Sequence, residues 1–146
     1  MSEAVFREHF EQIWNNKDAG AIERFIAPTY RGFDAEELIS GVAGYKQHFE
    51  MITTAFPDMR IAIDVILEEP DRDGTRVAAR YAVEATHAGP FGDIPPTAKR
   101  VRVTGTAIAR IRNRQLVEEH ANADALGLLQ QIGGTPGPVR VPPLFF

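Results

Sequence analysis

The stretch MRIAIDVILEEPDRDGTRVAARYAVEATH, residues 59–87, decides the fold class of this chain. Its apolar residues alternate with polar ones on both sides of a turn, PDRDG at residues 70–74, and this period of two predicts a hairpin of two strands. One face of the second strand is mostly apolar, and it carries Val77, Ala79, Tyr81, Val83, Ala85 and His87. A strand with one apolar and one polar face is typical of an antiparallel sheet that covers a core.

The same pattern continues downstream. A loop rich in glycine and proline, residues 89–97, leads into two more predicted strands at about residues 99–111 and 115–124. A short helical segment follows at residues 126–132, and Gly133 ends it. The tail from residue 135 contains four prolines and is expected to be extended, with its apolar end, residues 144–146, docked on this chain or on a partner.

Upstream of residue 58 the apolar spacing is helical. It predicts helices over residues 4–15, from Asp18 to Pro28, and from about residue 41 to 55, whereas residues 30–40 are ambiguous. Helices followed by strands indicate the α+β class. We therefore expect three N-terminal helices packed in a strongly curved antiparallel sheet of about four strands, an α+β barrel that encloses an apolar pocket. The domain would span residues 1–134, with a Pro-rich tail at 135–146. Periodicity alone also allows a filled core.

Composition excludes several classes of function. The 146 residues include no cysteine, which rules out disulfides, thiolate metal sites and a cysteine nucleophile. The net charge is −4 and no basic run occurs, so nucleic acid is not an expected partner. The four histidines are isolated and lack metal-ligand spacing, so no metal or organic cofactor is expected. No stretch resembles a secretion signal or a membrane span, and a cytoplasmic location with no membrane partner is the expectation.

Six short motifs, taken together with their order and spacing, are informative about the family: WNN (14–16), AFPD (55–58), THAGPF (86–91), IPPT (94–97), LVEEH (116–120) and GLLQQIG (127–133). Together they resemble the SnoaL-like polyketide cyclase family, within the ketosteroid-isomerase-like, or nuclear-transport-factor-2-like, cone fold. The resemblance covers about residues 6–133. It implies an α+β barrel with a deep hydrophobic pocket, usually a homodimer, and cofactor-free acid/base catalysis of an intramolecular aldol ring closure.

The resemblance also implies a catalytic residue. Asp124 matches the acid/base aspartate of the family, and His120 stands where the family commonly has tryptophan. Residues 30–33 replace a segment in which many members carry histidine, and Ala98 replaces a usual glycine. His120, Asn122 and Asp124 share one parity, so a regular strand would direct all three to one side, with Asp124 at the pocket floor. Alternatively, Asp124 is the N-cap of the helix that follows.

The remaining candidates, and Asn122 with them, would bind substrate. Tyr81 could donate to a substrate oxyanion, or be a core aromatic. His87 would lie at the pocket rim, or be a structural histidine, and Trp14 and Phe10 would form walls of the pocket or of the core. The predicted function is acid/base chemistry on a hydrophobic carbonyl compound, in which Asp124 removes an α-proton and His120 or Tyr81 stabilises the developing oxyanion. The alternatives are a non-catalytic binder of a hydrophobic small molecule, or a hydrolase or isomerase that uses the same pocket.

Overall fold

The computed structural model describes residues 2–34, 36–133 and 142–146 of the chain. Its helical elements are α1 (Ser2–His9), the π-helical turn η1 (Phe10–Asn15), the 3-10 turn η2 (Ala19–Ala21), α2 (Ile22–Phe25), α3 (Gly41–Ala55) and α4 (Ala125–Ile132). Its strands are β1 (Ile26–Phe33), β2 (Glu37–Ser40), β3 (Arg60–Asp71), β4 (Gly74–Thr86), β5 (Arg100–Arg112) and β6 (Gln115–Ala123). The predicted α+β class is confirmed.

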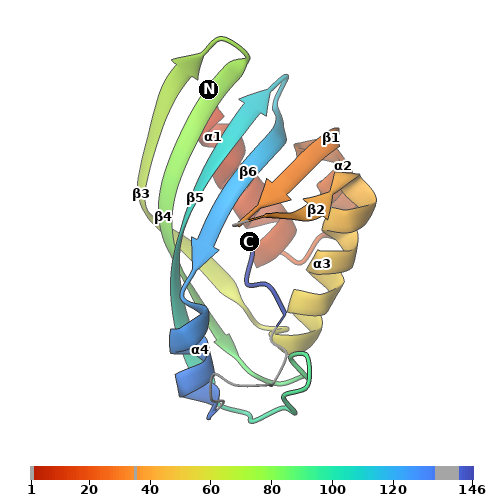
Figure 1. Cartoon of the computed structure of the whole chain (residues 1–146), viewed down its shortest axis with the longest axis vertical. Helices are drawn as coiled ribbons and strands as arrows, with labels where there is room; N and C mark the ends of the chain where they lie inside the picture. The colour runs from red at the N-terminus through yellow and green to blue at the C-terminus, as the bar shows by residue number, and fades with distance from the viewer. Residues whose placement is uncertain (1, 35, 134–141) are drawn as a thin grey trace.

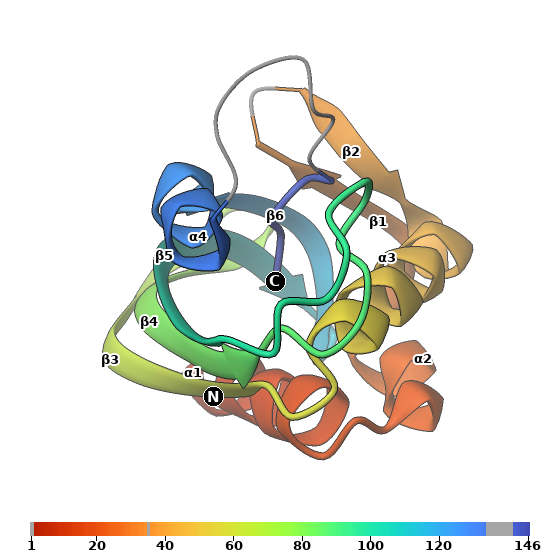
Figure 2. The ribbon, with the colours of Figure 1, turned by 90° about the horizontal axis from the view of Figure 1, so that it is seen from below.

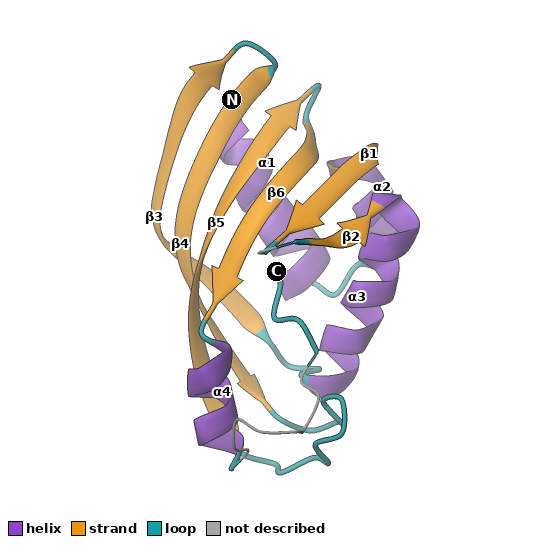
Figure 3. Cartoon of the chain, viewed as in Figure 1, coloured by secondary structure: helices purple, strands orange, loops and turns teal. Residues whose placement is uncertain are grey.

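One six-stranded sheet, in the order β2-β1-β6-β5-β4-β3, curls around the helices (Figures 1 and 3). Neighbouring strands are antiparallel, except that β1 and β6 run parallel. Within the described residues the edge strands β2 and β3 do not pair, so the sheet is open rather than the closed barrel that the sequence suggested. Helix α1 packs on β3 and β4, whereas α3 packs on β1 and β2. These helices cover the concave face of the sheet.

The expectation of about four strands was too low, because β1 and β2 were missed. The predicted second helix reached Pro28, but α2 ends at Phe25 and Pro28 lies within β1. The ladder between β1 and β6 is interrupted between Ile26 and Arg31. A proline cannot donate to a ladder, so it is tolerated at such an interruption, and in a sequence it has the same signature as a helix end.

The faces of the main strands follow the predicted alternation. In β4 the residues with the parity of Tyr81 are buried from Val77 onward: Val77, Ala79, Tyr81, Val83 and Ala85. The predicted helix at residues 4–15 is present as α1 followed by η1, whose i→i−5 hydrogen bond from Asn16 to Glu11 marks a π-helical turn. Trp14 lies on this turn and is fully buried against the inner face of the sheet and α3.

The end of the described chain lies inside the curled sheet (Figure 2). Residues 135–141 of the predicted tail lie outside the described residues. Residues 142–146, called the 142–146 segment below, form no helix or strand, and Leu144, Phe145 and Phe146 are buried. The expected docking of this apolar end is therefore on this chain, in the space that the sequence suggested as a pocket.

Candidate functional site

Strand β6 carries a carboxyl group into the interior. Its ladder with β5 shifts register at Ile111, and a bulge of this kind changes which side chains point inward. Beyond the shift Glu119 and Ala121 are buried, whereas His120 and Asn122 are exposed. Glu119 is thus the acidic residue that β6 directs toward the helices.

Glu119 is completely buried and only half satisfied by hydrogen bonds. Its Oε1 accepts a hydrogen bond of 2.8 Å from the Tyr30 hydroxyl, and its Oε2 has no partner among the described residues. Burial raises the pKa of Glu119 to about 8, although the hydrogen bond from Tyr30 acts in the opposite direction. At pH 7 such a carboxyl group is mostly protonated, and it can give or take a proton near neutrality.

Aromatic side chains from four elements surround this carboxyl group. Tyr30 of β1 packs against Tyr45 of α3 with a ring-centroid distance of 5.3 Å, and the Trp14 indole on η1 donates to the Tyr45 hydroxyl at 2.9 Å. Burial, and secondly the charge of Glu119, raise the pKa of Tyr30 and of Tyr45 well above the usual range of tyrosine. Both phenols therefore stay protonated. We call this cluster, completed by Tyr81, the aromatic site.

Tyr81 contributes an unused hydroxyl from β4. Its ring lies over Gly105, its cross-strand partner on β5, where a Cβ atom would stand 2.6 Å from the Tyr81 hydroxyl oxygen. That hydroxyl is buried and has no hydrogen-bond partner among the described residues. Burial, followed by the charge of Glu119, raises the pKa of Tyr81 above its usual value. The site thus holds a second protonated group that can donate.

The 142–146 segment occupies the aromatic site. The Phe146 ring lies 5.8 Å from Trp14 and 6.1 Å from Tyr81, in edge-to-face orientation with both. The main-chain oxygen of Phe145 lies 2.5 Å from Nε2 of His48 on α3. Burial lowers the pKa of His48 below its usual value, so the imidazole is neutral at pH 7.

Three of the predicted site residues lie together in the interior: Phe10, Trp14 and Tyr81. The Phe10 ring packs edge-to-face on Tyr81 at 5.3 Å, and both Phe10 and Trp14 are buried. They line the aromatic site, a position that fits both alternatives, a pocket wall and a core wall. Whether they contact a substrate remains a prediction.

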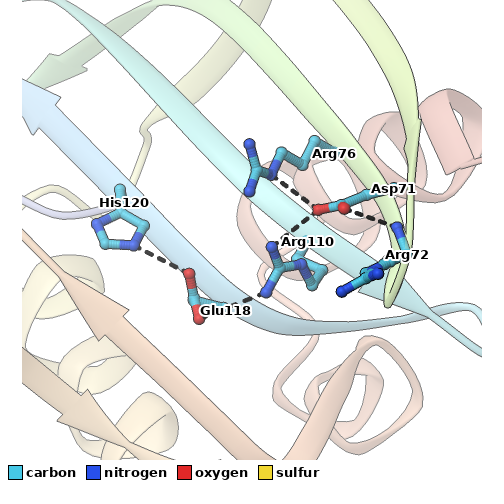
Figure 4. Close-up of polar contacts among 6 residues, drawn as sticks. All are labelled: Asp71, Arg72, Arg76, Arg110, Glu118 and His120. Carbon is cyan, nitrogen blue, oxygen red and sulfur yellow. Dashed lines mark hydrogen bonds and ion pairs between the residues drawn. The ribbon is translucent and has the colours of Figure 1, made fainter.

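His120 and Asn122 lie on the opposite side of the sheet. His120 is exposed, stacks on Phe33 at 4.8 Å and lies 3.1 Å from Glu118. Figure 4 shows it at one end of a polar network on the outer face that continues through Glu118 and Arg110 to Asp71. The inward orientation predicted for this parity is wrong, because the register shift in β6 reverses it.

Asp124 is also outside the aromatic site. It is exposed and follows the end of β6, where its Oδ1 accepts a hydrogen bond of 2.8 Å from the main-chain nitrogen of Gly127. It is therefore the N-cap of α4, which is the alternative that the sequence also offered. Its predicted place at the pocket floor is wrong. Its part in a reaction is a separate prediction, which a variant can test.

His87 is buried on the predicted apolar face, at some remove from the aromatic site. Its ring packs against Phe56 at 5.6 Å, and its Nδ1 lies 2.9 Å from the Thr97 hydroxyl and accepts from the Thr97 main-chain nitrogen at 3.3 Å. These two contacts hold the loop of residues 87–99 in place, as expected if His87 is a structural histidine. None of the described contacts joins it to Glu119.

Sequence reasoning missed Glu119, Tyr30, Tyr45 and His48. One signal was present for Glu119: from residue 120 to 124 polar residues alternate with Ala121 and Ala123, so the apolar parity, which Glu119 shares, marks the inner face. His48 lies at helical spacing among buried residues of α3, three after Tyr45. Tyr30 gave no signal, because β1 itself was not recognised.

Among the described residues, no group of three or more histidine, aspartate or glutamate side chains is arranged to hold a metal ion. No helix in the described ranges is long and apolar enough to cross a membrane.

An open, curled α+β sheet whose concave face is covered by helices is the cone-shaped fold that the resemblance implied. The family model of SnoaL-like polyketide cyclases matches residues 4–132. The chain belongs to this family, and the resemblance predicted from its motifs is confirmed. A search of curated proteins gave no match.

Solved structures agree with this assignment. AclR from Streptomyces galilaeus, described as a candidate hydroxylase, is 28% identical, with a TM-score of 0.80 over 93% of this chain and 83% of its own. TsrD from Streptomyces laurentii is 23% identical, with a TM-score of 0.80 over 92% and 96% of the two chains. IdmH from Streptomyces antibioticus, described as a candidate polyketide cyclase, is 23% identical, with a TM-score of 0.77 over 91% and 99%. The last two show a shared fold.

Proposed function

We propose that this protein catalyses metal-free, cofactor-free acid/base chemistry on a hydrophobic carbonyl compound, with Glu119 as the proton-transfer residue. The observation that carries the proposal is a fully buried carboxyl group with one free oxygen and a pKa of about 8. A base with this pKa is stronger than an exposed carboxylate, and its conjugate acid is present at neutral pH. Family membership supports a reaction of the polyketide cyclase type, an intramolecular aldol ring closure.

The proposed steps balance without an added reagent. The ionised form of Glu119 accepts an α-proton on Oε2, its free oxygen, while the Tyr30 hydroxyl holds Oε1. The electron pair of the broken C–H bond forms an enolate, which attacks a second carbonyl carbon of the same molecule and forms a C–C bond. The alkoxide then takes the proton back from Glu119, which regenerates the carboxylate.

Tyr81 is the proposed donor to the negative oxygen that develops. Its hydroxyl is buried, protonated and without a partner in the described chain, and Gly105 gives it room. A fixed donor in a site without water stabilises an oxyanion more than a solvated donor does. This keeps the role that the sequence suggested for Tyr81 and replaces Asp124 by Glu119 as the base.

The test is exchange of the α-protons of 2-tetralone, a bicyclic ketone, in deuterated water, followed by NMR. We expect exchange above the buffer rate that rises with pH and levels off above about pH 8, since the carboxylate is the base. Glu119→Gln should lower it by about a hundredfold or more. Glu118→Gln, which removes the neighbouring carboxylate on the outer face, should leave it unchanged. Equal rates in both variants would refute the role of Glu119.

A non-catalytic binder of a hydrophobic small molecule is the second candidate. The observation in its favour is that the aromatic site already holds apolar side chains of the 142–146 segment. Saturable binding of 2-tetralone without any catalysed exchange would favour this function. Hydrolysis and isomerisation would share the first proton transfer, and analysis of the products in labelled water separates them from ring closure.

We also propose a homodimer through the outer face of the sheet. Leu67 and Ile108 are 65% and 51% exposed there, and cross-strand pairs join them through Ala78. Ion pairs such as Arg80 with Asp64 flank this row. A face with both signs of charge around an apolar centre is self-complementary about a twofold axis.

A further inference from the structure

The 142–146 segment has the features of a ligand of the aromatic site as well as those of a core element. It belongs to no helix or strand, yet three consecutive side chains are buried, ending with Phe146 between Trp14 and Tyr81. Among the described residues, the contact between Phe145 and His48 is its one hydrogen bond to the rest of the chain. Its hold on the site therefore consists of apolar contacts and one carbonyl contact.

The His48 contact has a defined direction. A main-chain carbonyl oxygen can only accept, so Nε2 of His48 must carry the proton and donate it. The imidazole is neutral, as burial favours, and has a single N–H, which this contact uses. If the segment left, that N–H would face an apolar space beside the Trp14 ring, 6.4 Å away between ring centroids. A buried donor without an acceptor is costly, so the site favours an occupant that carries a carbonyl group.

We propose that a carbonyl ligand enters the aromatic site by displacing the chain's own 142–146 segment, and that His48 donates to the carbonyl oxygen of whichever occupant is present. The segment is thus an internal competitor, and His48 is the residue that selects carbonyl compounds. The inference rests on the proposed function only in assigning a carbonyl compound to the site, and it requires no turnover.

A substitution on β1 offers a way to weaken the binding of the 142–146 segment without changing the sequence of the segment. A Cβ atom on Gly32 of β1 would stand 2.9 Å from the far end of the Phe145 ring and 3.0 Å from the Tyr30 hydroxyl oxygen. Gly32 is in ordinary extended backbone, so alanine is allowed there, and the Phe145 ring, with the Tyr30 side chain, must shift. Gly32→Ala changes the site and Phe146→Ala changes the segment, and each should lower the fraction of molecules in which the 142–146 segment fills the aromatic site.

The experiment measures binding of two ligands with the same ring skeleton, 2-tetralone and tetralin, which differ in the carbonyl group. The readout is fluorescence of Trp14, the one tryptophan of the chain, checked by calorimetry. We expect Phe146→Ala to bind both ligands about tenfold or more tightly than the unmodified protein, since the apparent affinity rises with the fraction of free sites. Gly32→Ala should shift both affinities in the same direction.

The selectivity of His48 is read from the ratio of the two affinities in the Phe146→Ala background. We expect His48→Leu to lower the preference for 2-tetralone by about three- to tenfold, the effect of one lost hydrogen bond. His48→Gln keeps an N–H donor and should restore part of the preference. An unchanged ratio in His48→Leu would refute the carbonyl role.

The unmodified protein gives an independent readout. With the Phe145 carbonyl carbon labelled, saturating 2-tetralone should move its NMR signal to that of a carbonyl exposed to water. The proposed competition between ligand and segment would be refuted by a Phe145 signal that does not move at saturation. Equal affinities in Phe146→Ala, Gly32→Ala and the unmodified protein would also refute it. The result is distinct from the proposed function: proton exchange measures catalysis, whereas the affinities and the Phe145 signal measure displacement, and either proposal can fail alone.

Discussion

The proton on Glu119 makes the stability of this protein depend on pH in a direction that can be worked out. The pKa of Glu119 is about 8 in the folded chain, against 4.5 for an ordinary glutamate. Between these values the folded state keeps a proton that the unfolded state has lost. Stability therefore falls as pH rises from about 4.5 to 8 and is level above that range. At about 1.4 kcal/mol per unit of pKa, the loss is about 5 kcal/mol.

Glu119→Gln isolates this effect. Glutamine resembles the protonated carboxyl group in shape and can still accept from Tyr30, so the two proteins should have similar stability near pH 4.5. The unfolded form of the variant has no carboxyl group at this position to ionise. The folded variant should therefore be more stable toward unfolding than the unmodified protein, by up to about 5 kcal/mol at pH 8 and above. Burial also lowers the pKa of His9, to about 4, and that of His48, but both histidines are present in both proteins and cancel in the difference.

The assay is urea unfolding followed by circular dichroism at half-unit intervals from pH 4.5 to 9. The control is Glu118→Gln, which removes a carboxylate from the exposed face of the same strand and should run parallel to the unmodified protein. A difference between Glu119→Gln and the unmodified protein that stays constant with pH, or grows toward acid, would refute a proton held by Glu119.

Four further results are expected. Tyr30→Phe removes the hydrogen bond that favours the ionised carboxylate, so it should move the midpoint of the exchange-rate profile above pH 8, and a downward shift would contradict this. Asp124→Ala should lower stability by about 1 kcal/mol in urea unfolding, because it removes the N-cap of α4. Asp124→Asn, still a good N-cap, should keep both the stability and the rate of α-proton exchange. A large loss of α-proton exchange in Asp124→Asn would restore the prediction that Asp124 is catalytic. Ala98 has a φ of 59°, so Ala98→Gly should raise stability by about 0.5–1 kcal/mol in the same assay, and a loss would show that no strain is relieved. Leu67→Asp should convert the proposed dimer to a monomer in sedimentation velocity, and a monomer before any substitution would exclude the proposed interface.

The sequence alone determined the features that depend on neighbours along the chain. The period of two in β3 to β6, the turn at residues 70–74 and the helical spacing of α3 predicted these elements to within a few residues. The inward face of β4 followed from alternation, because a regular strand directs every second side chain to the same side. The motif order identified the family for the same reason, since it needs no contact between distant segments.

The tertiary structure decided which acid is inside. The resemblance placed Asp124 on the inner side, and His120 with it by parity, whereas the fold, after a one-residue shift in the ladder of β6, buries Glu119. The alternation with Ala121 and Ala123 pointed to this face, but the register shift that turns it inward depends on pairing with β5.

The partners of Glu119 depend equally on distant pairing. Tyr30 meets it only because β1 runs parallel to β6, and a parallel pair between distant strands leaves no local signature. The place of Phe145 and Phe146 was likewise open, because an apolar end can dock on any exposed apolar surface. The curled sheet offers these rings an enclosed aromatic surface, and their burial there is a property of the assembled interior.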